Sequence, residues 1–237
     1  MVHLRLKKWS RGEEHANDYS SEYLVTITSP DHAASEAYRT LRTNLLHALG
    51  DDPPKAIVVT SPGPMEGKSS TCANLGVVLA QANKDTLILD CDLRKPTIHK
   101  TFGLRNLWGV VNLLTRERNL QEVWQDSLQP GLKIVTSGPL PPDPSALLYS
   151  RPFAHLLDQL RWEFDYVLLD SPPTQLVCDP MGLSAQADGV LLVIDSQNTR
   201  KESVRRSIRS LEAVGANVLG TVMNNFEVPT SSGGYYD

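Results

Sequence analysis

Short, almost continuous runs of apolar residues alternate with longer amphipathic stretches along most of the 237-residue chain. Apolar runs of this kind predict buried strands, and helical stretches between them indicate a parallel sheet that is covered on both faces. The runs span residues 55–61, 85–92, 132–138, 166–173, 189–196 and 217–225. The pattern therefore predicts an α/β fold with a doubly wound, mainly parallel sheet and helices on both faces.

The pattern differs before the first of these runs. Residues 1–30 are polar and aperiodic apart from 23–27, YLVTI, which we predict to be a short edge strand. A helical period then begins after Asp31 or Ser35 and stops at Gly50. We expect a helix there, ahead of the first buried strand.

The composition divides the chain into three parts. We expect a flexible segment over 1–30, one domain over 31–226, and a disordered tail over 227–237 because that tail is rich in Gly and Ser. The net charge of −4 gives no reason to expect a nucleic-acid partner. No apolar run approaches the 18 residues of a membrane span, and three scattered cysteines fit reduced thiols in the cytoplasm.

The stretch 61–70, SPGPMEGKSS, lies between a predicted strand and a predicted helix. A glycine-containing turn at that place presents backbone amides to phosphates, a lysine such as Lys68 can bridge the β- and γ-phosphates, and Ser69 can reach Mg²⁺. The generic loop has glycine where this chain has Pro62, and Met65 lies inside the turn. The alternative is a Gly-Pro turn whose lysine is merely exposed.

Acidic residues stand at the carboxyl ends of two predicted strands. Asp90 and Asp92 alternate around Cys91 in LILDCDLRKP, so both carboxylates face one site while the thiol points into the core. Asp170 ends the strand of YVLLDSPP and is placed to hold Mg²⁺ through water. The alternative is that these acids only cap the helices that follow.

Together, SPGPMEGKSS, LILDCDLRKP and YVLLDSPP resemble the three Walker-type motifs of bacterial protein-tyrosine kinases (BY-kinases). These are cytoplasmic catalytic domains of the P-loop NTPase superfamily that regulate capsule and exopolysaccharide synthesis. The similarity runs from about residue 34 to about 226 and includes EAYRTLRTN and PPDPSALL. The family's loop also lacks the leading glycine, so Pro62 is ordinary and only Met65 departs from it.

The resemblance implies an ATP- and Mg²⁺-dependent tyrosine kinase. Asp90 would accept the tyrosyl proton with Asp92 nearby, and Arg94 would organise that loop. Lys68, Asp90, Asp92 and Asp170 would form the catalytic set, and the metal would be held by Ser69, Asp90 and Asp170. The nucleotide would contact Gly63, Pro64, Met65, Glu66, Gly67, Lys68, Ser69, Ser70 and, at the adenine, Asn224.

The resemblance also implies partners. Glu36, Arg39 and Arg42 match the family's self-association motif and share one helix face, which points to a homo-oligomeric ring. Tyr235 and Tyr236 would be the phosphate acceptors, presented to a neighbouring subunit. We expect a membrane-anchored activator whose cytoplasmic tail recruits the kinase to the inner face of the membrane, and a cognate tyrosine phosphatase.

Two other functions remain open at this point. One is a partition- or positioning-type ATPase switch of the same superfamily, although such proteins usually carry a second lysine early in the loop and 61–67 has none. The other is a catalytically weak scaffold for polysaccharide assembly. The alternative for Glu36, Arg39 and Arg42 is that they form an ordinary solvated helix face without a partner subunit.

Overall fold

A computed structural model describes residues 2–3, 24–47 and 53–226. Its centre is one eight-stranded sheet with the order β1-β8-β7-β2-β6-β3-β5-β4, in which every pair is parallel except β4 with β5. The strands are β1 (Val2–His3), β2 (Ala56–Thr60), β3 (Thr86–Asp90), β4 (Gln125–Asp126), β5 (Leu132–Val135), β6 (Tyr166–Asp170), β7 (Gly189–Asp195) and β8 (Val218–Asn224). The predicted parallel sheet is confirmed, and the six predicted runs are its six longer strands.

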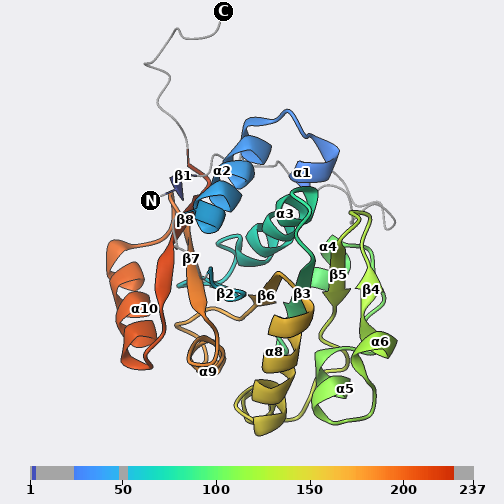
Figure 1. Ribbon diagram of the computed structural model, residues 1–237. Helices are drawn as coiled ribbons and strands as arrows, with labels where there is room; N and C mark the ends of the chain where they lie inside the picture. Colours follow the sequence, from blue (N-terminus) through green and yellow to red (C-terminus); the bar gives the residue numbers. More distant parts are fainter. Residues whose placement is uncertain (1, 4–23, 48–52, 227–237) are drawn as a thin grey trace, which may run out of the picture.

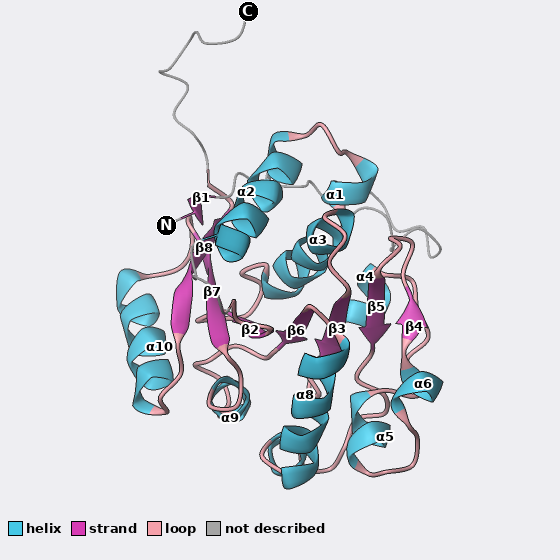
Figure 2. Ribbon diagram, in the orientation of Figure 1, coloured by secondary structure: helices cyan, strands magenta, loops and turns pink. Residues whose placement is uncertain are grey.

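Helices cover both faces of this sheet, with α1, α2 and α3 above it, α8 and α9 below it, and α10 at the left beside β7 and β8 in the view of Figures 1 and 2. Within the described residues, the helices are α1 (Val25–Thr28), α2 (Ala33–His47), α3 (Lys68–Gln81), α4 (Ile98–Thr101), α5 (Val110–Leu114), α6 (Leu120–Val123), α7 (Pro144–Leu148), α8 (Arg151–Glu163), α9 (Asp179–Ser184) and α10 (Lys201–Ala213). The doubly wound architecture is therefore confirmed.

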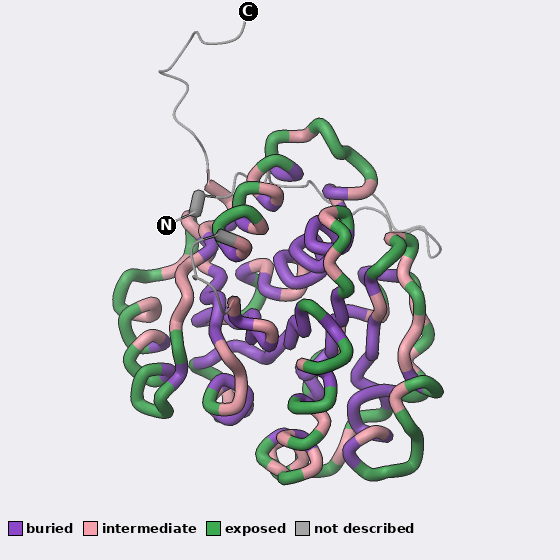
Figure 3. The backbone as a smooth tube through the Cα atoms, viewed as in Figure 1, coloured by how far each residue is buried: buried purple, intermediate pink, exposed green. Residues whose placement is uncertain are grey.

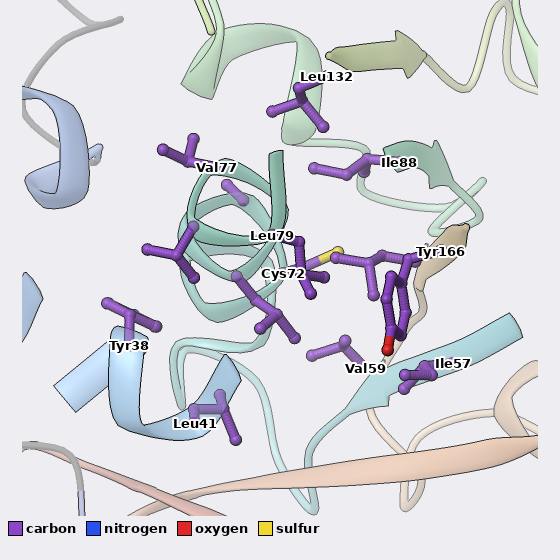
Figure 4. Packing of buried hydrophobic residues seen from close by; sticks show 14 of the residues in the cluster. Tyr38, Leu41, Ile57, Val59, Cys72, Val77, Leu79, Ile88, Leu132 and Tyr166 are labelled. Atoms are coloured by element: carbon purple, nitrogen blue, oxygen red, sulfur yellow. The ribbon is translucent and has the colours of Figure 1, made fainter. Parts of the chain in front are cut away.

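The alternation of side chains along each strand produces two separate hydrophobic cores. In β2, Ile57 and Val59 pack against α2 and α3, whereas Ala56 and Val58 pack on the opposite face. Helix α3 is buried along almost its whole length (Figure 3), which its all-round apolar sequence requires. Figure 4 shows the first core, where Tyr38 and Leu41 from α2 lie beside α3.

The predicted edge strand over 23–27 is wrong, because the chain forms the short helix α1 there. The Thr26 backbone N–H and hydroxyl both donate to the Asn74 Oδ1 atom of α3, at 3.1 and 2.8 Å, and Leu24 is buried in the core. These tertiary contacts outweigh the strand preference of a Val-Thr-Ile-Thr sequence. The helix predicted to end at Gly50 is α2, which the structure describes up to His47; Gly50 lies outside the described residues.

The parallel strands place the loops that carry the candidate site residues along one side of the sheet. Because β2, β3, β5, β6, β7 and β8 are parallel, the loops that follow their carboxyl ends lie along the same side of the sheet. Both loops with the predicted acids and the glycine-containing loop after β2 are among them. No helix in the described part of the chain is long and apolar enough to cross a bilayer.

Candidate active site

The loop between β2 and α3 forms a tight turn that leads into a helix N-terminus. Two of its residues have left-handed backbone, Met65 with φ of 62° and Gly67 with φ of 93°. Gly67 also lies so close to Asn224 that a Cβ atom would stand 2.1 Å from the Asn224 Nδ2 atom. Glycine is therefore required at 67, whereas Met65 adopts a glycine-like conformation with its side chain 89 % exposed.

Lys68, the first residue of α3, points into a cluster of carboxylates. Its ammonium lies 2.9 Å from the Asp92 Oδ2 atom and 3.7 Å from the Asp170 Oδ1 atom, and it donates to the Ser69 hydroxyl at 3.0 Å. The Ser69 hydroxyl in turn donates to the Asp170 Oδ2 atom at 2.6 Å. Asp90 and Asp170 are direct neighbours on β3 and β6. The residues predicted to act together are therefore brought together.

All three carboxylates are almost fully buried, which makes their ionisation costly. Burial raises the pKa of Asp90 well above its usual range, and the charges of Asp170 and Asp92 raise it further. Burial also raises the pKa of Asp170, although Lys68 and Ser69 oppose the shift. Burial lowers the pKa of Lys68, but the surrounding acids outweigh it and raise that pKa above its ordinary value. Lys68 is therefore charged.

The cluster has the chemistry that a hard cation needs. One oxygen of Asp90 and one of Asp170 are buried without a hydrogen-bond partner, and three carboxylates face a single ammonium. Within 24–47 and 53–226, no three acidic, His or Cys side chains are grouped closely enough to hold a metal by themselves. The two unpartnered carboxylate oxygens fit Mg²⁺, which takes one or two carboxylates and completes its shell with water and phosphate oxygens.

Asn224 ends β8 beside the loop, and its side chain holds the loop in place. Its Nδ2 atom donates to the Glu66 carbonyl oxygen at 3.1 Å, while its Oδ1 atom is buried without a partner. The Glu66 carboxylate accepts a 2.7 Å bond from the Thr199 hydroxyl. Burial raises the pKa of Glu66, and Asp195 raises it further. The loop is thus held from two sides.

Sequence reasoning missed the contribution of the segment after β7. Asp195 caps the turn that follows, accepting bonds from the backbone N–H groups of Gln197 and Asn198, and it also bonds the side chain of Asn225. That turn delivers Thr199 to Glu66. The available signal was an acid at the carboxyl end of an apolar strand, GVLLVID, the same pattern that singled out Asp90 and Asp170.

Arg94 links the loop after β3 to two helices. Its guanidinium donates to both oxygens of Asp179 at 2.7 and 3.2 Å and to the Ser145 hydroxyl at 3.0 Å. Burial raises the pKa of Asp179, but the bonds from Arg94 and Ser145 outweigh it and lower that pKa overall. Arg94 therefore ties the Asp90–Asp92 loop to α7 and α9. Cys91, between the two acids, is buried in the second core as expected.

The three residues of the predicted self-association motif do not have equivalent surroundings. Arg39 pairs with Glu36 at 2.9 Å on an exposed part of α2. Arg42 instead donates to the Val78 carbonyl oxygen of α3 at 3.1 Å, within its own subunit. Arg39 also donates to the Pro30 carbonyl oxygen at 2.8 Å, so both arginines form hydrogen bonds within their own subunit. The predicted acceptors Tyr235 and Tyr236 lie outside the described residues.

Comparison with known proteins places this site in a family. The profile of the family described as ParA: NUBPL iron-transfer P-loop NTPase matches residues 54–234. Tyrosine-protein kinase YwqD of Bacillus subtilis is 39 % identical over 214 residues, which cover 90 % of each chain. The putative tyrosine-protein kinase EpsB of Ralstonia solanacearum is 36 % identical over 90 % of this chain, but only 28 % of EpsB is covered.

Solved structures agree with the sequence relatives. The kinase domain of the Escherichia coli tyrosine kinase ETK superposes with a TM-score of 0.87 and 27 % identity, covering 100 % of this chain and 92 % of that domain. The resemblance of the three motifs is thereby confirmed, and with it the P-loop NTPase fold that forms a nucleotide-binding site. The chain belongs to the bacterial tyrosine-protein kinase family, within the P-loop NTPases.

Proposed function

We propose that the chain is an ATP- and Mg²⁺-dependent protein-tyrosine autokinase that phosphorylates Tyr235 and Tyr236 of a neighbouring subunit and so regulates capsule or exopolysaccharide synthesis. The observation that carries the proposal is the position of Lys68, whose ammonium joins the phosphate-loop helix to Asp92 and Asp170. A phosphate-binding lysine and the predicted metal and base residues thus share one small site. Family membership supports tyrosine as the acceptor.

In the proposed reaction, the phosphates of ATP lie against the backbone N–H groups at the start of α3. Lys68 turns from Asp92 towards the β- and γ-phosphates, and the charge it brings stabilises the transferring group. Bound Mg²⁺ would further neutralise the phosphate oxygens, and the carboxylates of Asp90 and Asp170, with the Ser69 hydroxyl, are the groups that would hold it.

The acceptor tyrosyl oxygen forms a bond to the γ-phosphorus, the bond from that phosphorus to the bridging oxygen breaks, and ADP leaves. Asp90 takes the phenolic proton on the carboxylate oxygen that does not hold the metal, and later releases it to solvent. Burial and the neighbouring acids raise the pKa of Asp90, which makes its carboxylate a stronger proton acceptor.

The proposed oligomer is a homo-oligomeric ring that uses Glu36 and Arg39, with Arg42 bracing α2 from inside its subunit. A membrane-anchored activator, acting through a cytoplasmic tail, would recruit this ring to the inner face of the membrane, and a tyrosine phosphatase would reset it. The much greater length of EpsB supports an additional region acting with this domain in some relatives.

A nucleotide switch of the partition or positioning type is the second candidate, favoured by the ParA-type profile that matches most of the domain. A switch hydrolyses ATP without labelling itself, whereas a kinase labels tyrosine. Incubation of the full chain with γ-labelled ATP and Mg²⁺ decides between them, with and without a candidate activator's cytoplasmic tail. Label on tyrosine supports the kinase, and ATP hydrolysis without label refutes it.

Two variants test the proposed roles of Lys68 and of the two tail tyrosines in that assay. Lys68→Met should abolish transfer, and Tyr235→Phe with Tyr236→Phe should remove most of the label while leaving ATP binding intact. Lys84→Gln is the matched control for Lys68→Met, because Lys84 lies just before β3, at the opposite end of the strands from the candidate site. Unchanged labelling in the double tyrosine variant would contradict the assignment of the tail as acceptor.

A further inference from the structure

Helix α10 concentrates positive charge on one flank of an acidic chain. Its cationic side chains, counting the N-cap, are Arg200, Lys201, Arg205, Arg206 and Arg209, which we call the α10 basic face. Two acids, Glu202 and Glu212, stand near the ends of the helix, so the segment 200–213 has a charge of +3 whereas the whole chain has −4. The middle of the helix carries three arginines and no acid.

The packing of α10 turns this basic face to solvent. On the inner side of the helix, Ser207 and Leu211 are buried, and Val204 and Ile208 pack against the second core. All five residues of the α10 basic face are exposed. Figure 3 shows α10 at the left edge of the molecule, beside β7 and β8, with its outer residues exposed. The contacts that fix the helix therefore also fix the direction of its charges.

The α10 basic face has no ionic partner in the part of the chain that the structure describes. None of its five residues belongs to an ion pair there. Arg206 is held by neutral groups, because its guanidinium donates to the Ser203 hydroxyl at 3.2 Å and to the Gln175 side-chain oxygen at 3.5 Å. The positive charges of the face therefore remain uncompensated by the described residues of the same subunit.

The arrangement of these charges opposes the stability of the helix. Lys201, Arg205 and Arg209 follow one another at i, i+4 spacing, at which like charges repel. The helix macrodipole favours cations in the last turn, yet the last turn of α10 has none and the first residues, Arg200 and Lys201, are cationic. Helix stability therefore does not account for the α10 basic face, and a negatively charged partner would relieve both repulsions.

The outer positions of α10 favour a lipid surface over a protein partner. The other exposed residues of the helix are Glu202, Ser210, Glu212 and Ala213, and none has a large apolar side chain. Protein interfaces need apolar or aromatic anchors at their core, whereas anionic headgroups attract cations without them. The row from Lys201 to Arg209 is about 12 Å long at about 1.5 Å per residue, so it can contact more than one headgroup.

We propose that the α10 basic face binds the anionic headgroups of a membrane surface and so holds the domain against the lipid by its α10 flank. The inference deepens the proposed function and rests on it for location alone: an activator brings the kinase to the membrane, and the face then meets the lipid at high effective concentration. Contact through a single rigid helix gives the domain one orientation at the surface.

The test is cosedimentation of the full chain with large unilamellar vesicles, without ATP. Vesicles of phosphatidylglycerol and phosphatidylcholine in equal parts should bind the protein at low salt, and vesicles of phosphatidylcholine alone should not. High salt should weaken the binding, because it screens exposed charges. The α10 variant Lys201→Gln, Arg205→Gln, Arg209→Gln should bind the anionic vesicles at least about tenfold more weakly, since each cation near such a surface contributes about fivefold.

Two controls separate the α10 basic face from overall charge and from folding. A matched variant removes the same net charge away from α10 and should weaken binding less than about threefold; its changes are Lys84→Gln, Arg116→Gln and Arg151→Gln. Arg205→Lys with Arg209→Lys should bind within about twofold of the unaltered chain, because a lipid surface responds to charge and not to the guanidinium fork. The α10 variant should keep its Tm, because glutamine favours helix and the like-charge repulsion is gone.

Equal binding of the α10 variant and the unaltered chain to anionic vesicles would overturn the proposal, as would an equal loss in the matched variant. Tighter binding to duplex DNA than to anionic vesicles at the same salt would assign the face to nucleic acid and overturn the lipid contact. The two proposals also fail separately. Label on tyrosine without vesicle binding keeps the kinase function and refutes the lipid contact, whereas vesicle binding without label on tyrosine does the reverse.

Discussion

Lys68 should stabilise the fold as well as bind phosphate, so Lys68→Met should unfold more easily. The ammonium is the positive charge that directly contacts the buried Asp92 and Asp170, and the methionine side chain cannot replace its bonds. Removing one member of a buried ion pair costs about 3–5 kcal/mol, because the remaining charge is buried without compensation. With a chain of this size, about 3 kcal/mol lowers Tm by about 6–12 °C.

The assay is thermal and urea unfolding with EDTA present, so that no divalent cation neutralises the carboxylates. Lys68→Met with Asp92→Asn is the control, because it removes one of the uncompensated charges and should recover a substantial part of the loss. A Lys68→Met protein within about 1 kcal/mol of the unaltered chain would refute the claim that these buried carboxylates depend on Lys68. Loss of kinase activity in Lys68→Met must accordingly be measured well below its Tm.

The pH dependence of this deficit follows from the direction of the shifts. Burial, Asp170 and Asp92 raise the pKa of Asp90 in the folded state, so its contribution to stability is greatest when it is protonated and is lost as the pH rises through the raised pKa. The loss in free energy of unfolding caused by Lys68→Met should therefore become smaller as the pH falls from 8 to 5. A deficit that stays constant or grows towards pH 5 would contradict the assigned burial of these charges.

Other residues give further tests. Met65→Gly should change ATP affinity less than about threefold, because Met65 already has left-handed backbone and its side chain is exposed; isothermal titration checks this. Arg94→Gln should cost about 1–2 kcal/mol in urea unfolding at pH 7, and the loss should vanish as the pH falls through the lowered pKa of Asp179, whose stabilising charge is then gone. Arg39→Ala should shift the ring towards monomer in light scattering, and both Arg39→Ala and Arg42→Ala should lower Tm by about 2–4 °C because each arginine loses a hydrogen bond within its own subunit. An Arg39→Ala protein that assembles normally would count against the self-association motif.

Some of the site follows from local sequence alone. The strand before 61–70 and the helix after it are indicated by their apolar runs, and the turn between them, with Gly67 before Lys68, places backbone amides and a lysine at a helix N-terminus, as a phosphate loop requires. The alternation of Asp90, Cys91 and Asp92 likewise fixes which of them faces the core. These predictions succeeded because each depends on neighbours in sequence.

Other parts depend on contacts between distant segments. Residues 25–28 have the composition of a strand, yet bonds from Thr26 to Asn74 make them helical. Arg42 has the spacing of an exposed helix face, but α3 lies close enough to use it. The period of one helix does not show which neighbour covers it.

The sequence by itself therefore determined the fold class, the phosphate loop and the acids at two strand ends, because strand and helix periods and strand-end positions are local properties. Tertiary structure decided which strands are neighbours, and hence that Lys68 reaches Asp92 and Asp170 and that Thr199 braces Glu66. It also placed the basic segment 95–100 against 138–140 to form a cavity. The strand order β7-β2-β6-β3-β5 brings these residues into contact, and this order arises from long-range packing of the whole sheet.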